Sequence, residues 1–307
     1  HPEIGRPPGR RRVLFMLGGA AAAGLLPTRG AWAVSASASA LAFDGDALVV
    51  AGAQLWRRDP SGDATLLPVP RSPIRALACH PDRPGRLFAA LDGGGLDRSE
   101  DGGRTWVAAS EGLPLAQVTA LAIAAGASDT IYAALADDGL WRSEDAGTNW
   151  SFVMDRPWIA EAEREILTLA SVNLASGMGG IWIYAGTGQG VTRVPDCFCR
   201  WQDVVAGDAM DALVAGTPPA PDAPLPEGER VSALVSAHGA PERLYAILPS
   251  GLWVSADGGV AWEQRSDLHA KALAVDPADP DHIAATSATD LKHSRDGGAT
   301  WATLAAF

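Results

Sequence analysis

Short apolar segments separated by polar turns recur in a fixed order along most of this chain. An inner strand is predicted at residues 74–79, 118–123, 166–171, 231–236 and 270–275. The fourth column of this segment is always leucine: Leu77, Leu121, Leu169, Leu234 and Leu273. A second strand follows at 86–91, 130–135, 182–187 and 243–248, with a weaker copy at 282–287. Apolar runs of this length, bounded by Gly, Pro and Asp, are typical of β-strands buried on both faces.

A third strand in each repeat runs into an acidic turn that ends in tryptophan. The five turns span 99–106, 143–150, 194–201, 255–262 and 294–301. Each places an aspartate five residues before its tryptophan, in the pairs Asp101 and Trp106, Asp145 and Trp150, Asp196 and Trp201, Asp257 and Trp262, Asp296 and Trp301. Successive tryptophans are 44, 51, 61 and 39 residues apart. This period is close to that of a four-stranded propeller blade.

One more repeat precedes these five. Segments 39–43, 47–51, 54–58 and 64–69 reproduce the four strands, with Leu41 in the leucine column, although the turn lacks a tryptophan. We therefore predict an all-β fold: a six-bladed β-propeller of four-stranded antiparallel blades. The expected blades are about 36–70, 71–114, 115–161, 162–228, 229–267 and 268–307, with a Pro-rich insertion at about 206–230.

The composition of the acidic turns predicts a structural role. The aspartate can accept hydrogen bonds from backbone N–H groups of its own turn, and the glycines that follow it tolerate positive φ. The tryptophan then opens the next strand and is expected to be buried between neighbouring sheets. All five Asp and Trp pairs are therefore predicted to stabilise the fold rather than to catalyse a reaction.

The first 33 residues resemble an export signal. A basic region with three consecutive arginines from Arg10 precedes a modestly apolar stretch at 13–26, and Ala31-Trp32-Ala33 is a small-x-small cleavage pattern. The paired arginines resemble a twin-arginine signal. The stretch is shorter than the roughly 18 to 20 residues that a membrane span requires. We expect the propeller at 34–307 to be exported from a bacterial cell to the periplasm or the exterior, with no membrane span after cleavage.

Removal of this segment makes the chain more acidic. It holds five arginines and one glutamate, so that 19 of 24 basic and 35 of 36 acidic residues remain, a net charge of −16. Such a surface repels nucleic acid and anionic lipid, and favours a protein, glycan or cationic partner.

The cysteines and histidines do not indicate a metal site or a cofactor. Cys79 ends an inner strand and is expected to be buried. Cys197 and Cys199 lie in the fourth acidic turn, where idle thiols, a local disulfide, and metal or redox chemistry all remain open. The six histidines form no pair with the spacing of metal ligands.

The turns resemble the Asp-box, or BNR repeat, of sialidases, sortilin-type receptors, xyloglucan-cleaving glycoside hydrolases and photosystem II stability/assembly factors. The resemblance covers about residues 71–307 and is specific for the fold, whereas these relatives differ in their sites. The chain is most similar in style to the assembly factors. That branch implies an exported protein that binds a protein partner.

The catalytic set that a sialidase would need is not found. Tyr132, Tyr184 and Tyr245 all occupy one column of the second strand, and a residue repeated in register is architecture. A two-carboxylate glycosidase would use acids outside the turns, but no pair has a distinctive spacing. These acids are Asp92, Asp137, Asp138, Asp155, Glu161, Glu163, Glu165, Asp208 and Asp211. No catalytic residue is therefore assigned, and the protein is expected to be non-enzymatic.

Two sets of residues are candidates for binding. Trp158 lies in a connection between blades, flanked by Arg156 and Arg164, and has no counterpart in the other repeats. Arg75 and Lys271 belong to a mostly polar column of the inner strands that is expected to ring the mouth of the central channel. We expect a scaffold or assembly factor that binds a protein; the alternative is a carbohydrate-active or glycan-binding propeller.

Overall fold

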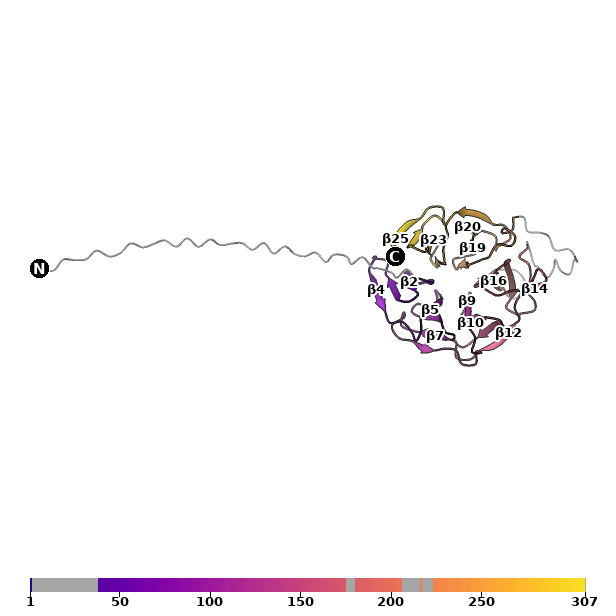
Figure 1. The fold of residues 1–307 in the computed structure, drawn as a ribbon, viewed down its shortest axis with the longest axis horizontal. Coiled ribbons are helices and arrows are strands. Elements are labelled where there is room, and N and C mark those ends of the chain that lie inside the picture. Colours follow the sequence, from indigo (N-terminus) through magenta and orange to yellow (C-terminus); the bar gives the residue numbers. More distant parts are fainter. Residues whose placement is uncertain (2–37, 175–179, 206–215, 217–222, 307) are drawn as a thin grey trace. The chain divides into compact units, whose positions relative to one another are not determined.

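The computed structural model describes residues 1, 38–174, 180–205, 216 and 223–306. The predicted export signal and most of the Pro-rich insertion lie outside these residues. All regular structure in the described ranges is β-strand, arranged in six antiparallel blades around a common centre (Figure 1). The predicted all-β, six-bladed propeller is confirmed.

Each of the first three blades is a four-stranded meander in which neighbours in sequence pair in space. Blade 1 consists of β1 (Ala40–Asp44), β2 (Ala47–Ala51), β3 (Leu55–Arg58) and β4 (Ala64–Leu67). Blade 2 consists of β5 (Ile74–Cys79), β6 (Leu87–Leu91), β7 (Leu96–Ser99) and β8 (Val107–Ala108). Blade 3 consists of β9 (Val118–Ala124), β10 (Ala127–Leu135), β11 (Gly139–Ser143) and β12 (Ser151–Met154).

The second half of the chain contains one short hairpin and three further blades. The hairpin consists of β13 (Trp158–Ile159) and β14 (Ala162–Glu163). Blade 4 consists of β15 (Thr168–Asn173), β16 (Ile181–Thr187) and β17 (Gly190–Pro195). Blade 5 consists of β18 (Ala233–Ala237), β19 (Ala240–Leu248), β20 (Gly251–Ser255) and β21 (Glu263–Ser266). Blade 6 consists of β22 (Ala272–Asp276), β23 (Asp279–Thr286), β24 (Asp290–Ser294) and β25 (Ala302–Ala306).

The ring closes where blade 6 meets blade 1. The inner strands contact one another in the order β1, β5, β9, β15, β18, β22, and β22 contacts β1. No blade combines strands from both ends of the described chain. Closure therefore depends on side-chain packing, in which Leu41, Leu48 and Val50 of blade 1 meet small residues such as Ala272, Ala274 and Ala284 of blade 6.

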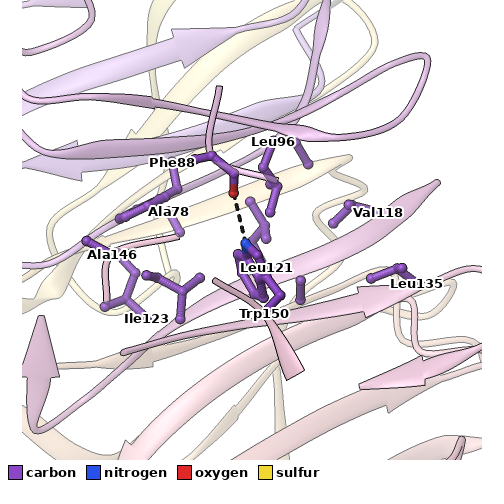
Figure 2. Close-up of a cluster of buried hydrophobic side chains, with 13 residues drawn as sticks. Ala78, Phe88, Leu96, Val118, Leu121, Ile123, Leu135, Ala146 and Trp150 are labelled. Atoms are coloured by element: carbon purple, nitrogen blue, oxygen red, sulfur yellow. Dashed lines mark hydrogen bonds between the residues drawn. The ribbon is translucent and has the colours of Figure 1, made fainter. Parts of the chain in front are cut away.

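Both faces of each blade are buried against neighbours, as the two-sided apolar strands predict. Between blades 2 and 3, Phe88, Leu96 and Leu121 pack with Trp150, which is 8% exposed (Figure 2). The Trp150 indole Nε1–H donates to the carbonyl oxygen of Ala109 at 2.9 Å, drawn as the dashed line. A tryptophan from one blade is thereby fixed to the backbone of the preceding blade.

Four acidic turns share one hydrogen-bond pattern. In the first, the Ser99 hydroxyl donates to Asp101 at 2.8 Å and accepts the Gly103 N–H at 2.8 Å. The Asp101 carboxylate also accepts the backbone N–H of Thr105 at 2.8 Å. The same contacts recur in the turns of Asp145, Asp257 and Asp296. The predicted role of the aspartate as an acceptor within its own turn is therefore observed in these four turns.

The glycine two positions after each of these aspartates faces the preceding blade. Gly103, Gly147, Gly259 and Gly298 all have φ between 83° and 91°. A Cβ on Gly298 would come within 2.3 Å of Leu252 in blade 5. Both backbone conformation and packing space therefore favour glycine at this column.

The expectation that every turn tryptophan is buried is only partly correct. Trp150 and Trp262 are 8% and 6% exposed, whereas Trp106, Trp201 and Trp301 are half-buried. In the first and last turns the indole N–H donates to the glycine carbonyl of its own turn, from Trp106 to Gly103 and from Trp301 to Gly298. The buried Trp262 donates to Gly259 in the same way, so this bond does not decide how far the ring is buried.

Blade 4 departs from the prediction of four strands. Its outer edge is a single bridge between Arg193 and Gln202 in place of a fourth strand. Its acidic turn has the buried Val194 where the others have serine, and Cys197 is joined to Cys199 by a disulfide. Asp196 therefore does not have the serine partner that fixes the other four aspartates.

We expect Trp150→Ala to lower the free energy of unfolding by about 3 to 5 kcal/mol, because it removes a large buried ring and leaves the Ala109 carbonyl without its donor. Chemical denaturation monitored by far-UV circular dichroism measures this change. The matched control is Trp158→Ala, which removes an exposed ring and should change stability little. A loss of stability below 1 kcal/mol for Trp150→Ala would contradict the packing role.

The turns also predict a loss of stability in acid. Hydrogen bonds from Thr105, Asn149 and Thr300 lower the pKa of Asp101, Asp145 and Asp296 from 3.8 to about 2. Because the pKa is lower in the folded state, the stabilisation is complete above about pH 4 and is lost as the pH falls towards 2. Urea midpoints should fall across this window. The triple Asp→Ala variant should be less stable at pH 7 and show a shallower slope; equal slopes would contradict the role.

Candidate functional site

The propeller has two faces of different character. All inner strands run in the same direction, so their first residues gather with the connections between blades on one side, which we call the entry face. There, loop residues Asp92 and Ala136 donate to the carbonyls of Pro73 and Gln117, which precede inner strands. The acidic turns lie on the opposite side, the turn face, where the Ala146 N–H donates to the Asp129 carbonyl near the start of β10.

The central channel contains two cavities. The cavity on the entry face has a volume of about 750 Å³, and the cavity on the turn face about 290 Å³. The leucine column lines the channel between them: Leu41, Leu77, Leu169, Leu234 and Leu273 border both cavities, and Leu121 borders the larger one. These side chains form an apolar ring at the level where the two cavities meet.

The entry cavity brings together all six members of the polar column: Ser39, Arg75, Thr119, Leu167, Ser232 and Lys271. Two of the hydroxyl groups join neighbouring blades. Ser39 donates to the Ile74 carbonyl at 2.7 Å, and Thr119 donates to the Ile166 carbonyl at 2.7 Å. These bonds fix the inner strands and leave the two basic side chains of the column as its charged groups.

The charge of the entry cavity is opposite to that of the chain. Arg75, Arg230 and Lys271 line it, and Asp92 is the one carboxylate among its described lining residues. Arg75 pairs with Asp92 at 3.4 Å, and both side chains are exposed. Among the described residues, neither Arg230 nor Lys271 has a side-chain hydrogen bond or ion pair. Two uncompensated cations at a concave mouth attract an anionic group.

The second candidate is the hairpin of β13 and β14, also on the entry face. Trp158 pairs with Glu163 across the hairpin, and Trp158 is 66% exposed. The two turn residues, Ala160 and Glu161, have φ of 49° and 60°. Two-residue hairpin turns with positive φ favour glycine or asparagine, so this conformation is unfavourable for Ala and Glu and must be held by the surroundings.

Arg156 supplies part of that support. Its guanidinium pairs with Glu163 at 2.5 Å, with Glu165, and with Asp137 at 3.4 Å in the β10–β11 loop. The hydrogen bonds that Arg156 donates to Glu165 and Glu163 raise the pKa of Arg156 above its ordinary value. Arg164 donates to the carbonyls of Ile159 and Ala160 at 3.0 and 3.2 Å. Both arginines thus support the hairpin, while the tryptophan is the side chain left free to contact a partner.

Those of the acids considered for a glycosidase that lie in the described residues do not form a pair in the entry cavity. Asp92 is there, but Asp137, Glu163 and Glu165 all bind Arg156. Asp138 accepts the indole N–H of Trp141 at 2.6 Å. Asp208 and Asp211 lie outside the described residues.

The tyrosine column is structural, as its repetition predicts. All three rings are buried. The hydroxyl of Tyr184 donates to the Gly258 carbonyl at 2.7 Å, and that of Tyr245 donates to the Pro280 carbonyl at 2.8 Å, in each case to the next blade. Burial raises the pKa of Tyr132, Tyr184 and Tyr245, which is unfavourable for a phenolate nucleophile.

The sequence did not indicate three features of the structure, two of which line the central channel. Arg230 directly precedes an inner strand, and extending the column comparison by one residue would have found it. Two histidine pairs were also missed: His80 and His238 have ring centroids 5.2 Å apart beside the turn-face cavity, and His282 Nε2 lies 3.5 Å from His293 Nδ1. Burial lowers the pKa of His238 and His293. The described residues contain no group of three or more potential metal ligands.

Cys79, which was expected to be buried, is partly accessible and borders the turn-face cavity. Its thiol lies 3.2 Å from the Phe43 carbonyl, and burial raises its pKa. Within the described ranges, no helix has the length and apolar character that a membrane crossing needs.

Comparison with family models and with curated protein sequences finds no match. Solved structures do match. A GH74 xyloglucanase from Xanthomonas campestris is 18% identical, with a TM-score of 0.55 over 88% of this chain and 47% of its own. YCF48 bound to a D1 peptide is 16% identical, with a TM-score of 0.50 over 87% of this chain and 82% of its own.

A third similar structure is the extracellular domain of a protein described as a one-component system from B. thetaiotaomicron. It is 12% identical, with a TM-score of 0.54 over 84% of this chain and 32% of its own. This chain spans less than half of the GH74 enzymes it matches. At these identities the likeness shows a shared propeller fold, in agreement with the resemblance inferred from the repeats.

We expect Arg156→Ala to loosen the hairpin, because three carboxylates lose their common cation while the turn keeps its unfavourable φ values. Hydrogen exchange of the amides in 158–163 should become faster by about tenfold, with the exchange of blade 3 unchanged. Arg156→Lys should recover part of the protection, since a single ammonium can bridge fewer of the carboxylates. Equal exchange in wild type and Arg156→Ala would contradict the support role.

Proposed function

We propose that this chain is an exported, non-enzymatic β-propeller that binds a protein partner through its entry face. The observation that carries the proposal is Trp158, a large aromatic side chain 66% exposed on a hairpin held by Arg156 and Arg164. Interfaces concentrate binding energy in aromatic anchors of this kind. A support built from two arginines around a solvent-exposed ring favours recognition over packing.

The entry cavity supplies the second part of the proposed interface. Arg230 and Lys271 lie at the mouth of the cavity and Trp158 on a connection of the same face. Leu115, a fully exposed apolar side chain, belongs to the connection between blades 2 and 3 on this face. A partner segment that combines apolar and acidic residues would complement both features, and YCF48, which shares the fold, has been solved with a bound peptide.

We propose the periplasm or the exterior of a bacterial cell as the location. The basic and apolar pattern before residue 34 supports export. The Cys197–Cys199 disulfide is compatible with an oxidising compartment.

A glycan ligand is the second candidate function. The GH74 enzymes share the fold, and an exposed tryptophan such as Trp158 also stacks on sugar rings. Hydrolysis is the less supported form of this alternative, because the described lining of the entry cavity has a single carboxylate, and the two-carboxylate mechanism needs a pair.

We expect Trp158→Ala to weaken partner binding by about 2 kcal/mol, roughly a thirtyfold rise in Kd, while leaving the fold intact. Partners captured from an envelope extract of the native host would be identified by mass spectrometry, and the leading one titrated against both proteins. The matched control is Leu66→Ala, which removes another exposed apolar side chain, 53% exposed, on the outer strand of blade 1.

Unchanged affinity in Trp158→Ala would contradict the proposed interface. Xyloglucan oligosaccharides form the second arm, monitored by tryptophan fluorescence. Saturable quenching that disappears in Trp158→Ala, without any captured protein, would favour the glycan function instead.

A further inference from the structure

The acidic turn of blade 4 places a disulfide in solvent on the turn face. Cys197 and Cys199 are both exposed, and one residue, Phe198, separates them. In the other four turns, hydrogen bonds of a buried serine hydroxyl and of the aspartate hold the turn together. Here Val194 replaces the serine, so the covalent bond stands where hydrogen bonds hold the other turns.

Phe198 has an unfavourable backbone conformation. Its φ is 52°, at the column where the other four turns have Gly103, Gly147, Gly259 and Gly298. Glycine adopts positive φ at this column without cost, whereas an L-residue with a Cβ is disfavoured there. Phe198 also packs on blade 3, with its ring 6.0 Å from that of Tyr132 and 5.4 Å from the Arg142 guanidinium. This contact holds Phe198 against blade 3 and leaves the sulfur atoms outside.

A purely structural disulfide is not well placed here. The loop that it closes is among the shortest a chain can form, so the loss of entropy in the unfolded chain is small. Exposed disulfides are also the labile ones. Opening the bond would let Phe198 relax from positive φ, and the neighbouring exposed Arg200 would stabilise a thiolate.

We propose that Cys197–Cys199 is an exchangeable disulfide that oxidises dithiols. A thiolate of the external dithiol attacks one Sγ, the sulfur–sulfur bond breaks, and the other cysteine leaves as a thiolate. The second thiol of the external molecule then attacks the mixed disulfide. Two electrons and two protons pass to this chain, which ends with two thiols, and the external dithiol ends as a disulfide.

The test is an equilibrium of the folded protein with dithiothreitol and, separately, with reduced glutathione, quenched by acid and alkylation and read by mass spectrometry. We expect Cys197 and Cys199 to become alkylated while the circular dichroism spectrum stays native. Cys79 is the internal control, because burial raises the pKa of its thiol and should slow its labelling.

Two variants separate exchange from a structural role. Phe198→Gly relieves the positive φ, and should shift the equilibrium towards the disulfide by about tenfold. Ala146→Gly makes the same kind of change in the turn of blade 3, where φ is 57°, and should leave the equilibrium unchanged.

Reduction that occurs only in denaturant, or that removes the native spectrum, would overturn the proposal and assign the bond to stability alone. An unshifted equilibrium in Phe198→Gly would overturn the explanation by strain. Because the turn face is opposite the entry face, partner affinity with the disulfide reduced is a separate readout and does not decide this test.

Discussion

Burial of both faces of every blade is the constraint on which the rest of the structure depends. A sheet that packs on two neighbours must present apolar side chains on both sides, and the tight centre of the ring requires small ones. The inner and second strands meet this requirement with alanine beside leucine, isoleucine and valine. Once the blades are fixed in this way, all inner strands start on the same side. The entry face therefore collects the connections between blades, and the turn face collects the acidic turns.

Features that repeat in register were predictable from the sequence. The leucine column, the glycine column and the buried tyrosines each repeat one residue type in the same environment in several blades. The fold and the polar lining of the entry cavity could therefore be predicted by comparing the repeats. Trp158 stood out for the opposite reason, as a residue without a counterpart in the other repeats, in the connection where the structure has a hairpin. In each case the comparison among blades replaced the missing knowledge of the three-dimensional arrangement.

Contacts that occur once were not predictable. Arg156 was expected at the interface, but the spacing along the chain did not show that Asp137, Glu163 and Glu165 converge on it. The members of each histidine pair come from different strands or blades. The bridge from Arg193 to Gln202 replaces the expected fourth strand of blade 4, and the sequence pattern did not indicate this change. Such contacts depend on which strands and loops come to lie side by side, which a local pattern does not contain.

The junction of blade 6 with blade 1 differs from the other five in one respect. The other five junctions join blades that follow one another along the chain, whereas among the described residues blades 6 and 1 meet through the packing of side chains such as Leu41 and Ala284. The surfaces of blades 6 and 1 are therefore brought together by the other blades, and they meet only when those blades are in place. The packing at this junction therefore depends on the arrangement of all six blades. A covalent link across it would convert a cooperative closure into a permanent one.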